Sequence, residues 1–222
     1  MQSIKPKWIK RIFVLILVIF ISYILYLNSL VKSQFSSEIE VKDNVIQVQN
    51  LIDDYPKELI NMLLLVEDQS FFDHIGVDFK EILRVLYGYL FEEKELRGAS
   101  TITQQLIKNT LLSRDKTLAR KTDEALMAIL MEMSYDKNFI LERYMNTVYL
   151  AQQGSTAIHG FASGSLHYFD KDVESLNLEE MATLVALLKG PSYYNPVNSP
   201  DRLSRRVEMI LSMHKNYKKI IQ

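Results

Sequence analysis

Acidic side chains stand where an apolar stretch of the sequence gives way to a polar one. Glu67 and Asp68 follow the apolar run MLLLV, and His74 and Asp78 come shortly afterwards. A carboxylate that emerges from an apolar helix is partly removed from water, which makes it a better general base near neutral pH. Helix ends also commonly carry acidic residues that simply face water, and a lone histidine is more often structural than catalytic. Glu67 is thus a candidate general base that needs support from other residues.

A second polar cluster precedes and opens the next helical pattern. Ser100 can act as the N-cap of this helix, so its first backbone N–H groups would be free to bind an anion. Lysines and arginines follow within a short segment, and such a charge run is either a solvated face or a phosphate site. The Gly-Ser start beside the cations favours the phosphate site. The candidate binding residues are Ser100, Thr101, Gln104, Gln105, Lys108, Asn109, Lys116, Arg120 and Lys121.

Glu124 follows Arg120 by four residues and Lys121 by three, so the three side chains share one face of a helix. One interpretation is a surface salt bridge worth a few tenths of a kcal/mol. The other is a second functional carboxylate that the two cations hold inside a cleft. The spacing fits both interpretations.

The elements that position these residues are predicted to be helices, because apolar residues recur with a helical period and few segments alternate. A helix is expected to end at Glu67, with Pro56 in its first turn. The linker, residues 32–50, contains short alternation that could form a strand. The expected fold class is mainly α, with further helices over 101–112, 117–135, 137–151, 160–168, 178–189 and 201–217.

The stretch from Ile82 to Phe91 is nearly all apolar but too short to cross a membrane. It can be a core helix. Next to a membrane anchor, it can instead be a surface that dips into the outer leaflet near a lipid substrate.

The N-terminal segment predicts one membrane anchor over residues 12–31, which carries no charge and is long enough to span a bilayer. The cations before it are Lys5, Lys7, Lys10 and Arg11. The positive-inside rule places residues 1–11 in the cytoplasm and the chain after Lys32 on the outside. A cleaved signal peptide is less favoured, because the apolar run is long and no A-x-A-like site follows it.

Composition excludes several other classes of protein. Lys+Arg 26 against Asp+Glu 27 gives a net charge of -1, so the basic excess that accompanies non-specific nucleic-acid binding is missing. The chain contains no cysteine, which excludes a disulfide framework, a thiolate metal site and a cysteine nucleophile.

Taken together, the polar segments closely resemble glycosyltransferase family 51, the peptidoglycan glycosyltransferases. The similarity covers about residues 51–211, and five motifs occur in the order of the family. They are E-D-x-x-F-x-x-H-x-G-x-D at 67–78, G-x-S-x-I-T-Q-Q-x-x-K-N at 98–109, R-K-x-x-E at 120–124, Glu142 with Tyr144 and Asn146, and K-G-P-S-x-Y-N-P at 189–196. Residues 152–159 form a longer segment than the commonest version.

This resemblance implies a lysozyme-like glycosyltransferase domain over 51–222 with a small jaw lobe that touches the membrane. The implied reaction polymerises lipid II into glycan strands, with inversion and release of undecaprenyl pyrophosphate. Glu67 is implied as the general base and Glu124 as the second essential carboxylate. Asp68, Glu142 and Asn146 join the candidate substrate-binding residues. No cofactor is required, although a divalent cation, Mg²⁺ or Mn²⁺, is an option at Asp68 and Asp78.

The implied partners are lipid II, the growing glycan chain, membrane lipid and transpeptidases, with no nucleic acid. The implied location is the cytoplasmic membrane, with the catalytic domain on its outer, periplasmic side. The five motifs fit a monofunctional transglycosylase or the glycosyltransferase part of a class A penicillin-binding protein. A lytic transglycosylase with a lysozyme-like fold is the alternative enzyme, and an inactive scaffold is the alternative to an enzyme.

Overall fold

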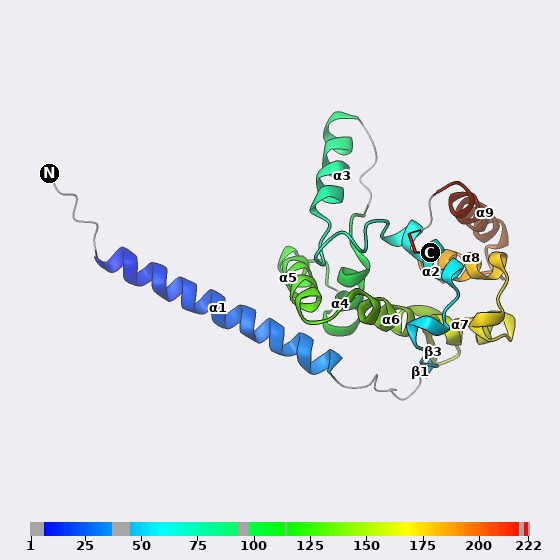
Figure 1. Cartoon of the computed structure of the whole chain (residues 1–222), viewed down its shortest axis with the longest axis horizontal. Coiled ribbons are helices and arrows are strands. Elements are labelled where there is room, and N and C mark those ends of the chain that lie inside the picture. The colour runs from blue at the N-terminus through cyan, green and yellow to red at the C-terminus, as the bar shows by residue number, and fades with distance from the viewer. Residues whose placement is uncertain (1–6, 37–44, 93–97, 114, 218–219, 222) are drawn as a thin grey trace.

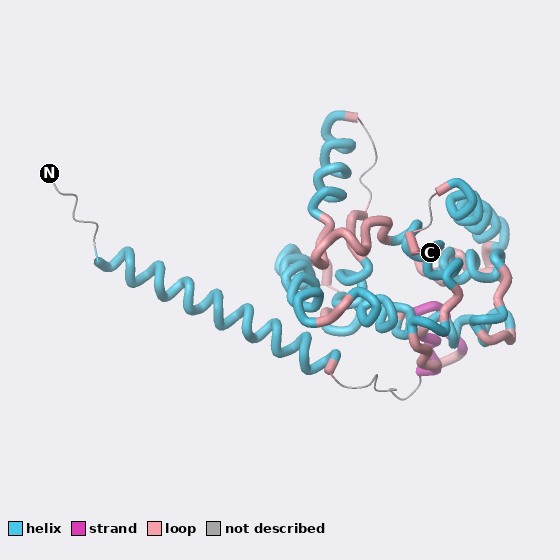
Figure 2. The backbone as a smooth tube through the Cα atoms, in the orientation of Figure 1, coloured by secondary structure: helices cyan, strands magenta, loops and turns pink. Residues whose placement is uncertain are grey.

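The computed structural model describes residues 7–36, 45–92, 98–113, 115–217 and 220–221. Residues 1–6 of the predicted cytoplasmic tail, and residues 37–44 of the predicted linker, lie outside the described residues. Helices dominate the described chain, as Figures 1 and 2 show, so the prediction of a mainly α fold is confirmed. The helices are α1 (Lys7–Phe35), α2 (Lys57–Glu67), α3 (Phe79–Phe91), α4 (Ile102–Leu111), α5 (Leu118–Ser134), α6 (Lys137–Thr147), α7 (Phe161–Phe169), α8 (Leu178–Leu187) and α9 (Pro200–Asn216), with short 3-10 turns at Ile52–Asp54 and Val173–Ser175.

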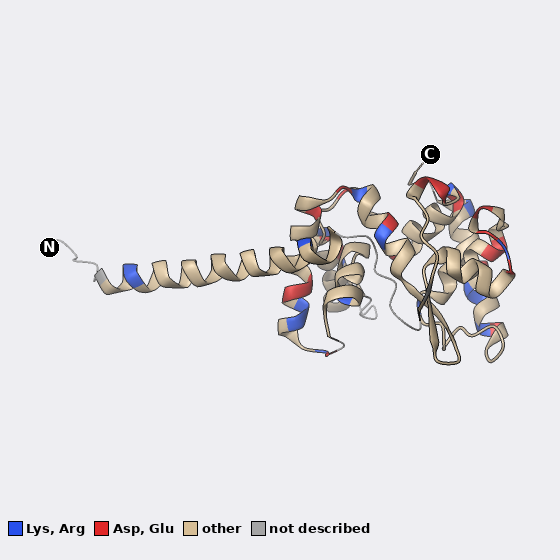
Figure 3. Ribbon diagram, turned by 90° about the horizontal axis from the view of Figure 1, so that it is seen from below, with Lys and Arg blue, Asp and Glu red and all other residues tan. Residues whose placement is uncertain are grey.

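Helix α1 is long and apolar enough to cross a membrane over Trp8–Phe35, and Figure 3 shows its long stretch without charged side chains. It continues past residue 31, where the predicted anchor ends. Its last turns pack against α4 and α5, and they bury Leu27, Val31 and Phe35 in the core of the domain. The Tyr23 hydroxyl also donates to Asp123 Oδ1 at 2.5 Å. The end of the apolar helix is therefore part of the fold that carries the candidate site.

Helix α2 is the central element of the core. Every residue from Leu59 to Leu65 is buried, and the helix packs against α8 and α9. Pro56 is the N-cap of α2 rather than a first-turn residue. The helix ends at Glu67, with Asp68 as its C-cap, so the buried helix presents the candidate base at the edge of the core.

A small sheet has the strand order β1-β3-β2, with β1 (Val45–Gln47) parallel to β3 (Thr156–His159) and β2 (Tyr149–Gln153) antiparallel to it. β1 confirms the strand expected in the linker. The predicted helix over 137–151 is wrong at its end, because α6 stops at Thr147 and the chain turns into β2. The hairpin turns at Gly154, which has a φ of +60°. A glycine at this point is the signal in the sequence that could have indicated the turn.

Helix α3 stands apart from the other helices (Figure 1). Of its residues only Gly88 is buried, while Leu86, Leu90 and Phe91 are 45%, 59% and 71% exposed. The interpretation of Ile82–Phe91 as a core helix is therefore wrong. Asp78 caps the helix by accepting a hydrogen bond from the Glu81 N–H at 2.8 Å. The result is an ordered apolar helix that no core covers in the described part of the chain.

Candidate active site

Glu67 lies at the end of α2, where a side chain of α4 holds its carboxylate. The Gln105 amide nitrogen donates to Glu67 Oε2 at 2.9 Å. The Tyr144 hydroxyl on α6 in turn donates to the Gln105 amide oxygen at 3.1 Å. Gln105 was predicted as a donor to phosphate, but both ends of its amide bind protein groups here. Three helices thus converge on one carboxylate.

Asp68, the residue after Glu67, binds the end of α2 to the start of α4. It is buried, its Oδ2 accepts from the Ile102 N–H at 2.9 Å, and His74 Nε2 lies 3.0 Å from the same oxygen. The other ring nitrogen of His74 accepts from the Gly76 N–H at 3.1 Å. His74 therefore has the structural, hydrogen-bonded role that a lone histidine commonly has. A negative charge at a helix N-terminus is also favourable.

The start of α4 differs from the sequence prediction. Its N-cap is Thr101, whose hydroxyl accepts from the Gln104 N–H at 3.1 Å, and not Ser100. The Gln104 amide oxygen accepts from the Thr101 N–H at 3.2 Å and completes a capping box. The Ile102 N–H, expected to be free for an anion, is bound by Asp68. The first turn of α4 is thus largely occupied by the protein itself.

Glu124 lies on α5 and is only 1% exposed on its side chain. Arg120 Nη1 donates to Glu124 Oε2 at 2.7 Å, and Lys121 Nζ donates to the other oxygen. Lys121 also donates to Ser100 Oγ at 2.9 Å. The interpretation as a solvent-exposed salt bridge is wrong, because this carboxylate is buried. It fixes two cations beside the segment that leads into α4.

Lys108 is exposed on α4, three residues after Gln105. Side chains three apart on a helix are neighbours, so this cation lies on the same face as the residue that binds Glu67. Asn109 and Lys116 are also exposed, Lys116 in the loop before α5. Residues 100–108 therefore connect the carboxylate of α2 with the cations of α4 and α5.

Glu142 and Asn146 lie elsewhere on α6. Each is two residues from Tyr144, which is about 200° around the helix, so they occupy the opposite face. Glu142 accepts from the Ile52 N–H at 2.9 Å, and Asn146 accepts from the Asn50 N–H at 3.0 Å. These bonds anchor the segment before α2, and the structure does not bring the two residues together with Glu67 by any hydrogen bond among the described residues.

Asp68 and Asp78 do not form a metal site as they lie. Asp68 binds the helix start and His74, while Asp78 binds Ser70 and the Glu81 N–H. Burial opposes ionisation of Asp78, but these hydrogen bonds outweigh it and hold the pKa of the carboxyl below its ordinary value. Within the described ranges, no group of three or more His, Asp or Glu is placed to hold a metal ion. A divalent cation in the reaction stays an untested prediction.

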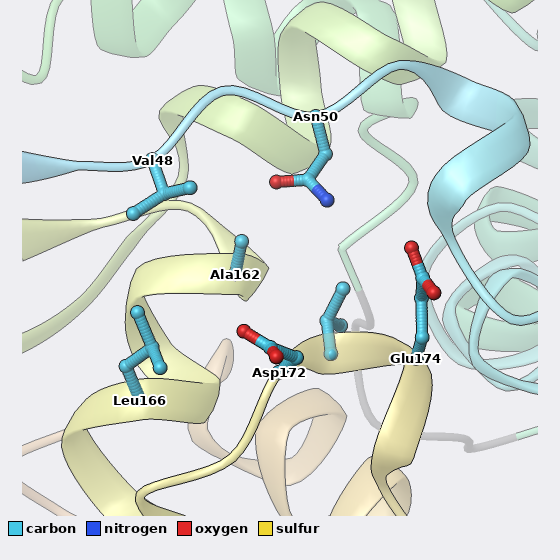
Figure 4. A pocket seen from close by; sticks show the side chains of 7 residues that line it. Val48, Asn50, Ala162, Leu166, Asp172 and Glu174 are labelled. Atoms are coloured by element: carbon cyan, nitrogen blue, oxygen red, sulfur yellow. The ribbon is translucent and has the colours of Figure 1, made fainter.

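A cavity of about 140 Å³ lies between the segment before α2, α7 and the turn at Val173–Ser175 (Figure 4). Asn50, Asp172 and Glu174 contribute its polar side chains. None of the candidate site residues lines it. The cavity is therefore distinct from the site around Glu67.

Comparison with known proteins agrees with this arrangement. A family model described as transglycosylase matches residues 33–215. Penicillin-binding protein 1B of Haemophilus influenzae is 41% identical over 178 residues, which cover 80% of this chain and 23% of that protein. Penicillin-binding protein 1B of Escherichia coli K12 is 42% identical over 159 residues, or 72% of this chain and 19% of that protein. Penicillin-binding protein 1A of Neisseria lactamica is 44% identical over 161 residues, or 72% of this chain and 20% of that protein.

The matched residues include both carboxylates and the cationic segment, within a mainly α domain. The chain belongs to the transglycosylase family, glycosyltransferase family 51, as the motifs predicted. The prediction of the enzyme class, a peptidoglycan glycosyltransferase, is confirmed at the level of this family. The chain spans about a fifth of the length of these relatives.

Proposed function

We propose that this protein polymerises lipid II into peptidoglycan glycan strands at the outer surface of the cytoplasmic membrane. The observation that carries this proposal is the Glu67 carboxylate at the end of a buried helix, held by Gln105 one helical turn from the Lys108 cation. A lytic enzyme would need the carboxylate but not the neighbouring cations.

In the proposed reaction, Glu67 takes the proton from the 4-hydroxyl of the acceptor sugar as that oxygen attacks the anomeric carbon of the donor. The new glycosidic bond forms with inversion, and the bond to undecaprenyl pyrophosphate breaks. The leaving group departs as an anion of low basicity, so the site needs cations more than a strong general acid. We assign this role to Lys108 and Lys116, which are exposed, and to Arg120 and Lys121, which Glu124 holds in place.

Incubating the purified protein with lipid II and separating the products on a gel tests the proposal. Polymeric glycan and released undecaprenyl pyrophosphate are the expected products. Cleavage of preformed glycan without any polymer would favour the lytic alternative, and neither activity would favour an inactive scaffold.

Lys108→Ala is expected to weaken binding of the pyrophosphate-bearing donor by about 10- to 100-fold, because a hydrogen bond to a charged group contributes about 1.5–3 kcal/mol. Binding of a sugar fragment without phosphate should change little. Titration calorimetry with both ligands measures the difference. Arg120 is less suited to this test, since its removal also leaves Glu124 without a partner.

Lys215→Ala is the matched control, because Lys215 is also an exposed lysine but lies on α9. It should bind both ligands as the unchanged protein does. Equal losses for the charged and uncharged ligands in Lys108→Ala would show that this cation is not at the phosphates.

The exposed apolar side chains of α3 support the proposal that the protein contacts the membrane at a second place, besides α1. We expect the triple substitution Leu86→Ser, Leu90→Ser, Phe91→Ser to release the domain from liposomes and to raise the KM for lipid II. These side chains are exposed, so their loss removes apolar area that can enter the outer leaflet and leaves the core intact. Flotation with liposomes measures the binding, in a variant without residues 1–22. That variant keeps the part of α1 that packs on the domain.

The matched control replaces Met133, Leu178 and Val197 with serine, because these apolar residues are also exposed but belong to other segments than α3. It should float with liposomes as before. If the α3 variant unfolds, or if the variant without residues 1–22 never binds liposomes, the proposed contact is wrong.

A further inference from the structure

Tyr144 lies behind the proposed base, with Gln105 between the two. Its side chain is among the largest that are fully buried in the described chain, and only 1% of the residue is exposed. The phenol oxygen is its one polar group, and it makes a 3.1 Å hydrogen bond to the Gln105 amide oxygen. A buried hydroxyl placed on one particular acceptor fixes the orientation of that acceptor.

The orientation of the Gln105 amide matters because its two ends are chemically different. The amide nitrogen donates and the amide oxygen accepts. With the oxygen bound by the Tyr144 hydroxyl, the nitrogen faces Glu67 Oε2 at 2.9 Å. A reversed amide would place its oxygen against the carboxylate, where the two acceptors repel each other. By donating to the amide oxygen, the Tyr144 hydroxyl stabilises the orientation in which the Gln105 nitrogen donates to Glu67.

The Tyr144 hydroxyl keeps its proton over the whole physiological pH range. Burial raises the pKa of Tyr144 well above its ordinary value of 10.0, and the negative charges of Glu67 and Asp68 raise it further. The hydroxyl is thus a permanent donor.

We infer that Tyr144 is a positioning residue for Glu67, acting through Gln105, an inference that rests on the proposed role of Glu67 as the base. Neither residue has to touch the substrate for this role. Gln105 holds the carboxylate in the rotamer from which it reaches the acceptor hydroxyl, and Tyr144 holds Gln105. Because a general base must lie within hydrogen-bond reach of the proton that it takes, a loose carboxylate reduces the rate of the chemical step.

Tyr144→Phe removes only the hydroxyl and should lower kcat about tenfold, with the KM for lipid II unchanged. We call the hydrogen bonds from Tyr144 through Gln105 to Glu67 the relay. Gln105→Leu removes its middle residue and should lower kcat about 100-fold. In the double variant, Tyr144→Phe should have no further effect on kcat, because the hydroxyl then has nothing to position. A purely structural role of Tyr144 would give additive effects or a change in KM.

Tyr55→Phe is the matched control for the loss of a buried hydroxyl. Tyr55 is 3% exposed, and its hydroxyl donates to Asn146 Oδ1 at 3.0 Å on the opposite face of α6. It should cost similar stability and leave kcat unchanged. An unchanged kcat in Tyr144→Phe, or an equal fall in Tyr55→Phe, would overturn the inference.

The same variants separate this inference from the proposed function. If the unchanged protein does not polymerise lipid II, the proposed function fails. The relay is still tested by chemical denaturation of the single and double variants, which should show coupling between Tyr144 and Gln105. If the unchanged protein polymerises but the variants show no coupling in kcat or in unfolding, the relay alone fails.

Discussion

Glu67→Gln is expected to lower the rate of glycan polymerisation by about 10²–10⁴-fold, the usual contribution of a positioned general base. The substitution is nearly isosteric, so α2 should still end at the same place. The new amide can still accept the hydrogen bond that Gln105 donates to Glu67. It cannot take a proton from the acceptor hydroxyl. The loss should therefore fall on kcat, with binding of lipid II largely retained.

Product gels and donor binding, measured on the same preparation, check this expectation. Glu208→Gln is the control, since Glu208 is exposed on α9, and it should polymerise as the unchanged protein does. Near-normal polymerisation by Glu67→Gln would remove Glu67 from its assigned role. A loss of folding measured by circular dichroism would instead show that the end of α2 depends on this carboxylate.

Much of the fold could be predicted because helices such as α5 and α9 bury one apolar face, which leaves a helical period in the sequence. The sequence left two interpretations of Ile82–Phe91 open, a core helix and a surface that dips into the membrane, and the structure excludes the core helix. Composition shows that this segment is apolar, but it does not show whether another element covers it. In the structure only Gly88 of α3 is buried. The hairpin at 149–159 was missed because its strands are short and follow a helical pattern directly.

The chemical types of the site residues could be predicted, but their partners could not. Gln105 and Lys108 were both assigned to the phosphates, since amides and cations both suit an anion. The structure separates them, because Gln105 binds Glu67 while Lys108 is exposed. Tyr144 stood in a motif without any assigned role. Its contact with Gln105 joins residues 39 apart in the chain, which no local spacing reveals.

Glu124→Gln is expected to lower both the rate of polymerisation and the free energy of unfolding. The carboxylate is 1% exposed and binds Arg120 and Lys121 through separate oxygens. Its neutralisation leaves both cations without their shared negative partner. Breaking a fully buried pair costs roughly 3–5 kcal/mol. Because Arg120 and Lys121 are 17% and 43% exposed, water can stabilise them in part, and we expect about 1–3 kcal/mol.

Under the proposed function, the expected loss of activity has a separate cause, which is the displacement of the two cations from the leaving group. Polymerisation should therefore fall at least tenfold even at temperatures where the variant is fully folded. Glu81→Gln provides the stability control, because it breaks the exposed pair between Glu81 and Arg84, whose side chain is 76% exposed. That loss should stay within about 1 kcal/mol, as for other surface pairs. If Glu124→Gln costs no more than Glu81→Gln and polymerises normally, Glu124 is an ordinary ion pair, and the cations of α5 need no carboxylate to bind pyrophosphate.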